Sequence, residues 1–205
     1  MELLAATLGA MGRTMGFSFA AGINLYATVA ILGLASRYGW VDLPPQFQAF
    51  DNNWIIGTAL VLYVVEFFAD KIPWVDSMWD AVHTVIRPIG GAAIAVTTLG
   101  DTSPATETMV ALLGGTLAAS THFTKTGTRV MANTSPEPFS NWALSLGEDL
   151  FVVGLGFLAL KYPAAAAIVV IVALVIIVAL SAWIIKAVRR RFRRSDVAGP
   201  RVAPQ

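Results

Sequence analysis

Cysteine is absent from this chain of 205 residues, and charged residues make up only 13% of it. The lack of cysteine excludes disulfides, thiolate metal sites and cysteine nucleophiles. Soluble domains usually contain about 25% charged residues, so the low share argues against that class. Hydrophobic residues make up 56% of the chain, and the mean hydropathy is +0.67. This composition indicates an all-α protein that crosses a lipid bilayer several times.

The chain also lacks the sequence signatures of common enzyme classes. It has no HExxH metalloprotease motif, no phosphate-binding GxxxxGK[ST] loop and no serine in a nucleophile elbow. Only two histidines are present, which leaves little beyond carboxylates for acid–base chemistry. We therefore expect no enzyme activity and no cofactor. A membrane enzyme that acts on lipid phosphate is the one enzymatic alternative.

Basic residues gather near the C-terminus, where seven of the fourteen lysines and arginines lie between positions 186 and 201. A basic run directly after an apolar segment is a topology signal for the cytoplasmic side, and it does not indicate nucleic-acid binding. We predict a transmembrane helical domain over residues 1–188 and a disordered basic tail over 189–205. The start of the chain lacks a basic n-region, so we expect no cleaved signal peptide.

Apolar segments predict about six transmembrane helices, since a bilayer core is spanned by about 20 helical residues. Gly22 and Asn24 interrupt the first segment, which indicates either a packing contact or a local unwinding. Pro88 and the pair Gly90–Gly91 predict a kink in the third apolar segment. The segments lie at 15–35, 54–68, 76–99, 109–123, 141–160 and 164–185.

The positions of lysine and arginine predict the orientation. Counting back six spans from the cytoplasmic tail places five basic residues inside and only two outside. Both termini are then cytoplasmic, and the polar segments 70–87 and 122–142 lie on the same side of the membrane. The inside residues are Arg13, Lys71, Arg87, Lys125 and Arg129, and the outside residues are Arg37 and Lys161.

The stretch EFFADKIPWVDSMWD, residues 66–80, places four carboxyl groups between two apolar segments. Glu66 and Asp70 are four residues apart, so they share one helix face. Pro73 breaks that helix, and Asp76 is a suitable N-cap for the next. Ionisable groups at membrane depth are costly without a partner, water or a ligand, which makes this stretch a candidate functional site. A polar stripe continues from it at helical spacing and comprises Asp76, Asp80, His83 and Arg87.

A second group of polar residues follows in the other half of the chain. Lys125 and Arg129 are explained either by positive-inside topology or by recognition of a phosphate or carboxylate. Glu148 and Asp149 interrupt the fifth apolar segment, and adjacent carboxylates cannot both face lipid cheaply. Lys125 and Arg129 belong to a polar helix face whose residues follow one another at helical spacing: His122, Lys125, Arg129 and Asn133.

His83 and Asp80 allow two interpretations. They are three residues apart, which suits a pair of metal ligands. A metal site needs at least three converging ligands, and the spacing alone does not show them. The alternative is a histidine that serves only as a hydrogen-bonding residue on the polar stripe.

A shift of 65 residues aligns the segment 73–76 with the segment 138–141, PWVD with PFSN. Either the match is chance or the chain contains two copies of a helical hairpin, a symmetry by which many transporters form a site. The helices entering the two hairpins carry opposite charges, so we expect ion pairs between them. The corresponding stripe residues are Asp76 with Asn141, Asp80 with Ser145, and His83 with Glu148.

Three stretches resemble the bacterial membrane-protein family known as domain of unknown function 4126. They are AGINLYATVAILGLASR, EFFADKIPWVDSMWDAVHTVIRP, and NTSPEPFSNW together with GEDL, within roughly Gly16 to Leu160. The resemblance implies a small multi-pass protein of the bacterial inner membrane without an established activity. It assigns no catalytic or binding residues.

We expect helices two to five to enclose a charged cavity open to the cytoplasm, through which a small polar or ionic solute is transported with protons or cations as coupling ions. A lipid-phosphate flippase or binder and a structural subunit of a membrane complex are the alternatives. The lipid bilayer is the expected partner, and the small size of the chain suits a homo-oligomer. The residues predicted to bind the solute or ion are Glu66, Asp70, Asp76, Asp80, His83, Lys125, Arg129, Asn133, Asn141, Glu148 and Asp149.

Overall fold

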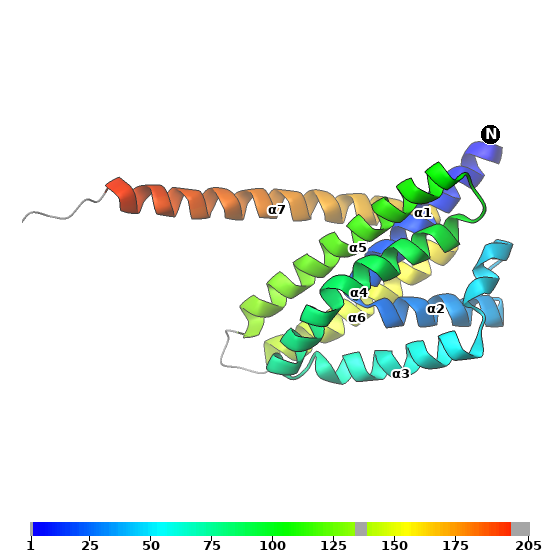
Figure 1. The fold of residues 1–205 in the computed structure, drawn as a ribbon, viewed down its shortest axis with the longest axis horizontal. Helices are drawn as coiled ribbons and strands as arrows, with labels where there is room; N and C mark the ends of the chain where they lie inside the picture. The colour runs from blue at the N-terminus through cyan, green and yellow to red at the C-terminus, as the bar shows by residue number, and fades with distance from the viewer. Residues whose placement is uncertain (1, 134–138, 198–205) are drawn as a thin grey trace, which may run out of the picture. The chain divides into compact units, whose positions relative to one another are not determined.

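A computed structural model describes residues 2–133 and 139–197, and every regular element in this part is helical (Figure 1). The all-α class is therefore confirmed. The chain divides into two compact units, residues 1–170 and 171–205, which are described separately. The elements are α1 (Glu2–Ile23), α2 (Leu25–Tyr38), the 3-10 helix η1 (Pro45–Phe50), α3 (Asn53–Ala69), α4 (Pro73–Leu99), α5 (Pro104–Asn133), α6 (Phe139–Lys161) and α7 (Pro163–Val197).

Three helices in the described part are long and apolar enough to cross a membrane: Pro73–Leu99, Phe139–Lys161 and Pro163–Lys186. Helix α3 is also apolar but has only 17 residues. These helices indicate a membrane protein. The count of six spans stays a prediction, because α2 has only 14 residues and α5 carries charged residues in its second half.

Large apolar side chains cover the outer faces of α3 and α4. Trp54, Val61 and Phe68 on α3 are 84%, 64% and 60% exposed, and Val85 and Ile89 on α4 are exposed to a similar degree. A soluble protein rarely leaves so many apolar side chains in contact with water. Such faces are suited to the hydrocarbon core of a bilayer, where helices can satisfy all their backbone hydrogen bonds internally.

The segment predicted as one span over 15–35 is two helices, and that prediction is corrected here. The backbone of Asn24 is extended, with φ −145° and ψ 99°, and its side-chain oxygen accepts a hydrogen bond from the N–H of Ala27. Asn24 is thus the N-cap of α2. Gly22 also makes a close contact, because a Cβ added there would lie 2.2 Å from the carbonyl oxygen of Ala118. Both interpretations of this stretch, unwinding and tight packing, therefore hold.

Helix α4 begins three residues earlier than the proposed N-cap Asp76. Ile72 is the N-cap, and Pro73 occupies the first turn, where its missing N–H costs nothing. The assignment of Asp76 as an N-cap was wrong, and the residue lies inside the first turn of α4, fully buried. The helix runs 27 residues and contains Pro88.

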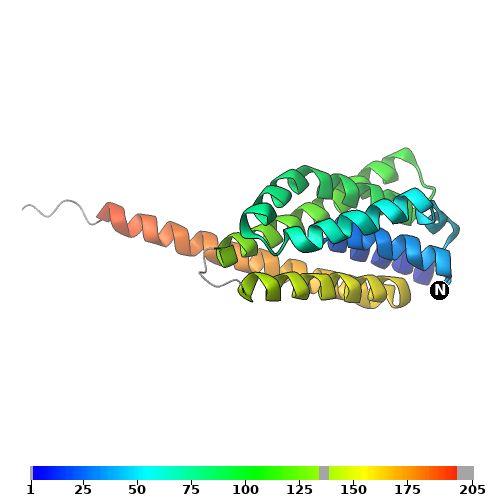
Figure 2. The same cartoon turned by 90° about the horizontal axis from the view of Figure 1, so that it is seen from below.

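Helices α4 and α5 lie side by side, with α1 packed against both (Figure 1). On the other side of the first unit, α2 and α3 run next to one another (Figure 2). Small residues permit the close approach of α4 and α5. A Cβ on Gly91 would lie 2.4 Å from the Cβ of Ala118, and one on Gly114 would lie 2.3 Å from the Cβ of Ala95. Close helix contacts through glycine are typical of membrane bundles.

We expect Gly114→Ala to lower the free energy of unfolding by about 1–3 kcal/mol, because its methyl group would collide with Ala95 and force the helices apart. Thermal unfolding of the full chain in detergent measures the loss. Gly127→Ala is the matched control in the same helix, where an added Cβ meets no atom within 4 Å. It should be neutral or stabilise by up to about 1 kcal/mol. Equal stabilities of the two variants would contradict this packing.

Two further predictions concern segments that are partly outside the described residues. Pro138, an aligned position of the proposed 65-residue repeat, lies outside the described residues, and the repeat stays a prediction. Helix α7 continues to Val197, past the predicted start of the basic tail at residue 189. Residues 198–205 lie outside the described part.

Candidate functional site

Nine ionisable side chains converge in the interior of the first unit. The carboxylates of Glu66, Asp70, Asp76 and Asp80 belong to residues that are at most 2% exposed. Buried charges of this kind are stable only when they are paired and hydrogen-bonded. We call the following set the buried charge network: Glu66, Asp70, Asp76, Asp80, Arg87, Lys125, Arg129, Glu148 and Asp149.

Helix periodicity positions these side chains. Glu66 lies one turn before the end of α3, and Asp70 caps that end. The predicted polar stripe on α4 is confirmed, since all four of its residues are buried on the side of the helix that faces the network. Lys125 and Arg129 are one turn apart on α5, and Glu148 and Asp149 come from α6.

Arg87 is the first of three cationic centres and is fully buried. Its Nη2 donates to Oε1 of Glu66 at 2.7 Å, and its Nη1 donates to Oδ1 of Asp80 at 3.2 Å. The second oxygen of Asp80 accepts from the Thr126 hydroxyl at 3.1 Å. Arg87 was recognised in the sequence as part of the stripe but was left out of the predicted site. Its spacing from Asp80 was the signal that could have included it.

Lys125 is the second centre. Its ammonium nitrogen lies 2.9 Å from Oδ2 of Asp70, 3.4 Å from Oε1 of Glu66 and 3.7 Å from Oε2 of Glu148. One cation thus joins carboxylates from α3, from the α3–α4 turn and from α6. The predicted ion pairs between the acidic end of α3 and the basic face of α5 are confirmed.

Arg129 is the third centre and binds two carboxylates. Its Nη2 lies 3.2 Å from Oδ2 of Asp70, and it makes two contacts with the carboxylate of Glu148, through Nε and through Nη2. Its Nη1 also donates to the backbone carbonyl of Asp70 at 2.8 Å. Such a bidentate arginine contact fixes the direction of both groups. Asp76 lies at the edge of this centre, 4.0 Å from Nη1.

The two histidines serve as hydrogen-bonding residues beside the network. Nη1 of Arg87 donates to Nδ1 of His122 at 2.7 Å, so that nitrogen carries no proton and His122 is neutral. Nδ1 of His83 lies 2.7 Å from the carbonyl oxygen of Trp79 and must donate to it. Nε2 of His83 lies 2.9 Å from the hydroxyl of Tyr26. In the described part of the chain no three His, Asp or Glu side chains are arranged to hold a metal ion, so the metal interpretation gains no support.

Residues at the break between α1 and α2 form hydrogen bonds with the network. The carbonyl oxygen of Gly22 accepts from Arg87 at 3.4 Å, and that of Ile23 accepts from Lys125 at 3.4 Å. The side-chain amide of Asn24 donates to Oδ1 of Asp149 at 3.2 Å. Carbonyls at a helix end have no partner within the helix, so the cations of the network satisfy them here.

Carboxyl groups outnumber cations in the network by six to three. Several of their oxygens are buried without a hydrogen-bond partner among the described residues, namely Oε2 of Glu66, Oδ1 of Asp70 and Oδ2 of Asp149. An unpaired buried acceptor normally costs about 1–3 kcal/mol. The network is therefore not fully neutralised by the side chains that surround it.

Lys71 does not supply the missing positive charge by direct contact. Its ammonium donates to the carbonyl of Phe67 at 2.8 Å and to the hydroxyl of Ser145 at 3.3 Å, and it lies over the Phe67 ring. Burial lowers the pKa of Lys71, and the carboxylates of Asp149 and Asp70 act in the opposite direction. Lys125 and Arg129, and not Lys71, are thus the direct partners of Asp70.

The predicted cytoplasm-facing cavity stays a prediction, and among the described residues the three cations of the network are almost fully buried between the carboxylates. Arg87, Lys125 and Arg129 are 0%, 4% and 1% exposed, so they fill the space between the carboxylates and leave almost no surface for water. Glu148 keeps the largest opening, at 17% of its side chain. Asn141 is also buried, and its carbonyl accepts from Arg129, while the side chain of Asn133 lies outside the described residues.

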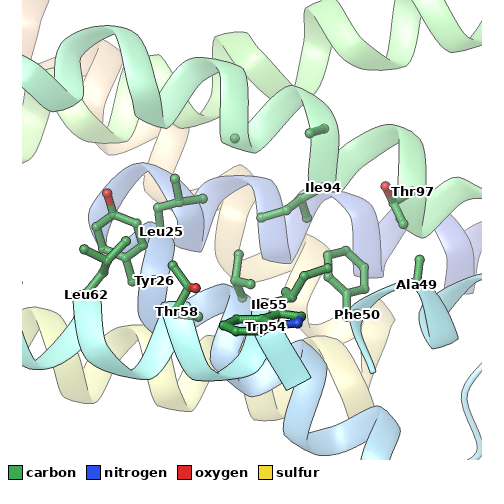
Figure 3. Close-up of a pocket in the computed structure, with 14 residues that line it drawn as sticks. Leu25, Tyr26, Ala49, Phe50, Trp54, Ile55, Thr58, Leu62, Ile94 and Thr97 are labelled. Atoms are coloured by element: carbon green, nitrogen blue, oxygen red, sulfur yellow. The ribbon is translucent and has the colours of Figure 1, made fainter. Parts of the chain in front are cut away.

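A hollow of about 660 Å³ lies elsewhere, between α2, η1, α3 and α4, and it is lined almost entirely by apolar side chains (Figure 3). Tyr26 forms part of its wall, and its hydroxyl contacts His83 of the polar stripe. Sequence reasoning missed this hollow, because its lining residues come from four elements and share no motif.

Residues 11–183 match the family described as Domain of unknown function (DUF4126), and the chain belongs to this family. The matched region contains the whole buried charge network and the break between α1 and α2. No curated protein and no solved structure matches the chain.

Proposed function

We propose that this DUF4126 protein moves a small ion or polar solute across the bacterial inner membrane. In this proposal the buried charge network is the binding site, in a state that is closed to both sides of the membrane. The observation that carries the proposal is a network of six carboxyl groups and three cations attached to a broken helix inside a membrane protein. Both termini would be cytoplasmic, as the basic residues in the last part of α7 suggest.

Buried charge supports a transport function more than a purely structural one. Ionisable groups inside membrane proteins are costly, and they commonly mark ion paths and proton relays. Transporters also place broken helices at their sites, where free carbonyls help to bind ions. Here the carbonyls of Gly22 and Ile23 face Arg87 and Lys125 in the same way.

Two carboxylates of the network are each shared by two cations, which suggests how the closed network would open. Asp70 lies within ion-pair distance of both Lys125 and Arg129, and Glu148 does too. A carboxylate released by one cation therefore keeps a second partner. Such shared pairs allow a small movement of α5 to exchange partners without leaving a bare buried charge, which would cost several kcal/mol.

Transport is tested with the full chain in liposomes on a solid-supported membrane, where stepped changes of H⁺, Na⁺, K⁺ or Cl⁻ concentration produce currents. At least one step should evoke a current that empty liposomes lack. Asp70→Asn should reduce that current about tenfold or more, since removing one partner from a buried ion pair leaves an uncompensated charge at a cost of several kcal/mol. Asp51→Asn is the matched control, because Asp51 pairs with Arg37 at the exposed surface. Absence of current, or equal currents from both variants, would refute the proposal.

A structural role in a membrane complex is the alternative that the dense ion pairing favours. In that case Asp70→Asn would lower the stability of the protein, and no ion step would evoke a current from the parent chain. Binding of a lipid phosphate is less well supported, because Lys125 and Arg129 are buried and already bound to carboxylates. A headgroup would first have to displace Asp70 or Glu148.

A further inference from the structure

Asp149 differs from the other carboxyl groups of the network. It is 9% exposed, and within the described residues no cationic side chain lies within 4 Å of its oxygens. Oδ1 accepts a hydrogen bond from the amide of Asn24, and Oδ2 is buried without a partner. A carboxylate buried in this way is strongly destabilised, whereas a neutral carboxylic acid is tolerated.

The charged groups around Asp149 do not offset the cost of burying its carboxylate. Glu66 and Asp70 repel a negative charge on it, and Lys125 attracts one. Lys71 attracts one as well, but its ammonium is bound to Phe67 and Ser145. The groups that act on Asp149 come from four parts of the fold: Asn24 at the α1–α2 break, Tyr63 and Glu66 on α3, Asp70 and Lys71 in the following turn, and Lys125 on α5.

A bound metal ion does not account for the unpartnered oxygen. The described residues provide no set of three carboxylate or imidazole ligands around a common point. The near-zero exposed surface of the neighbouring carboxylates also leaves no room for a hydrated cation beside them. A proton needs neither a ligand shell nor a cavity.

We propose that Asp149 is a proton-binding residue and that the proton is the ion coupled to transport, an inference that rests on the function proposed above. One proton from a hydronium ion of the solvent joins Oδ2, which becomes a hydroxyl, while Oδ1 remains the acceptor of the Asn24 amide. One O–H bond of the hydronium ion breaks, and a water molecule remains. In this conformation Asp149 carries the proton.

Asn24 is the positioning residue in this scheme. Its side chain caps α2 through Oδ1 and contacts Asp149 through Nδ2, so it joins the helix break to the proton site. Loss of the proton places a full negative charge beside this break. The carboxylate then draws Lys125 away from Glu66 and Asp70, which opens the shared ion pairs of the network.

Infrared spectroscopy of the purified full chain tests this directly, because a protonated carboxylic acid has a carbonyl stretching band that a carboxylate lacks. At mildly acidic pH the parent chain should show this band, and Asp149→Asn should lose the intensity of one carboxyl group per chain. Asp101→Asn is the control, since Asp101 lies exposed in the loop before α5. An unchanged band in Asp149→Asn, or no band in the parent chain, overturns the proposal.

A second variant keeps the test valid if Asp149→Asn does not fold. Asn24→Ser retains a side chain suitable for the cap but is too short to reach Asp149. Removal of the amide donor frees the acid carbonyl, so the band should shift to higher wavenumber. A band at the parent position would show that the protonated group is not Asp149, which overturns the proposal.

The infrared result separates this inference from the proposed transport function. A protonated Asp149 in a chain that gives no ion current would refute transport and leave the proton site intact. A current carried by Na⁺, K⁺ or Cl⁻, unaffected by Asp149→Asn, would refute proton coupling and leave transport intact.

Discussion

Arg87→Met is expected to lower the free energy of unfolding by about 3–5 kcal/mol, because it removes one partner of a buried ion pair and leaves the others charged. Glu66 and Asp80 would each lose their contact with the guanidinium, and the neutral His122 would lose the donor to its Nδ1. The side chain is fully buried, so water cannot replace it. Unfolding of the full chain in mixed detergent micelles measures the change.

Arg37→Met is the control for this variant. Arg37 pairs with Asp51 at 2.7 Å, but these side chains are 30% and 36% exposed. An exposed pair contributes only about 0–1 kcal/mol, so the control should unfold almost like the parent chain. Adding Glu66→Gln to Arg87→Met should restore part of the stability, because it removes one uncompensated charge. Equal losses from Arg87→Met and Arg37→Met would show that the network is not buried.

Gly22→Leu is expected to lower the free energy of unfolding by about 3 kcal/mol or more, because the close approach of α1 and α5 leaves no room for a side chain. A Cβ at this position would lie 1.8 Å from the Thr121 hydroxyl and 2.2 Å from the carbonyl oxygen of Ala118. The backbone carbonyl cannot rotate away, so the helices must separate. The carbonyl of Gly22 would then move away from Arg87.

Thermal unfolding measures the stability of the Gly22→Leu variant, and the ion current of the reconstituted chain measures its effect on the network. We expect both to fall. Gly9→Leu in the same helix is the control, since an added Cβ there meets no atom within 4 Å. A Gly22→Leu variant as stable as the Gly9→Leu variant would contradict the close contact between α1 and α5.

Helical spacing predicted much of the site. Residues three and four apart share a helix face, and this alone brought Asp76, Asp80 and His83 together on α4. Opposite charges on α3 and α5 predicted the ion pairs of Asp70 and Lys125. Both inferences depend on local geometry and on charge, which the sequence displays directly.

The closed state of the network was not predictable in the same way. Whether carboxylates surround water or a cation depends on how far the helices separate, and that distance is determined by contacts such as those of Gly91 and Gly114 across α4 and α5. The helix break at Asn24 was predicted only as one of two alternatives, and the segment was still assigned as one span. The residues on either side are apolar, so the hydropathy of 15–35 resembles that of one continuous span.

The lack of native cysteine permits the most direct test of the closed network, which is the reaction of single-cysteine variants with a small hydrophilic thiol reagent in membranes. Ser145 is fully buried beside Lys71, whereas Gln48 is exposed in η1. Ser145→Cys should react about a hundredfold more slowly than Gln48→Cys, since a burial cost of a few kcal/mol must be overcome before reaction. Equal rates would contradict the account, because they would show that water reaches the network freely.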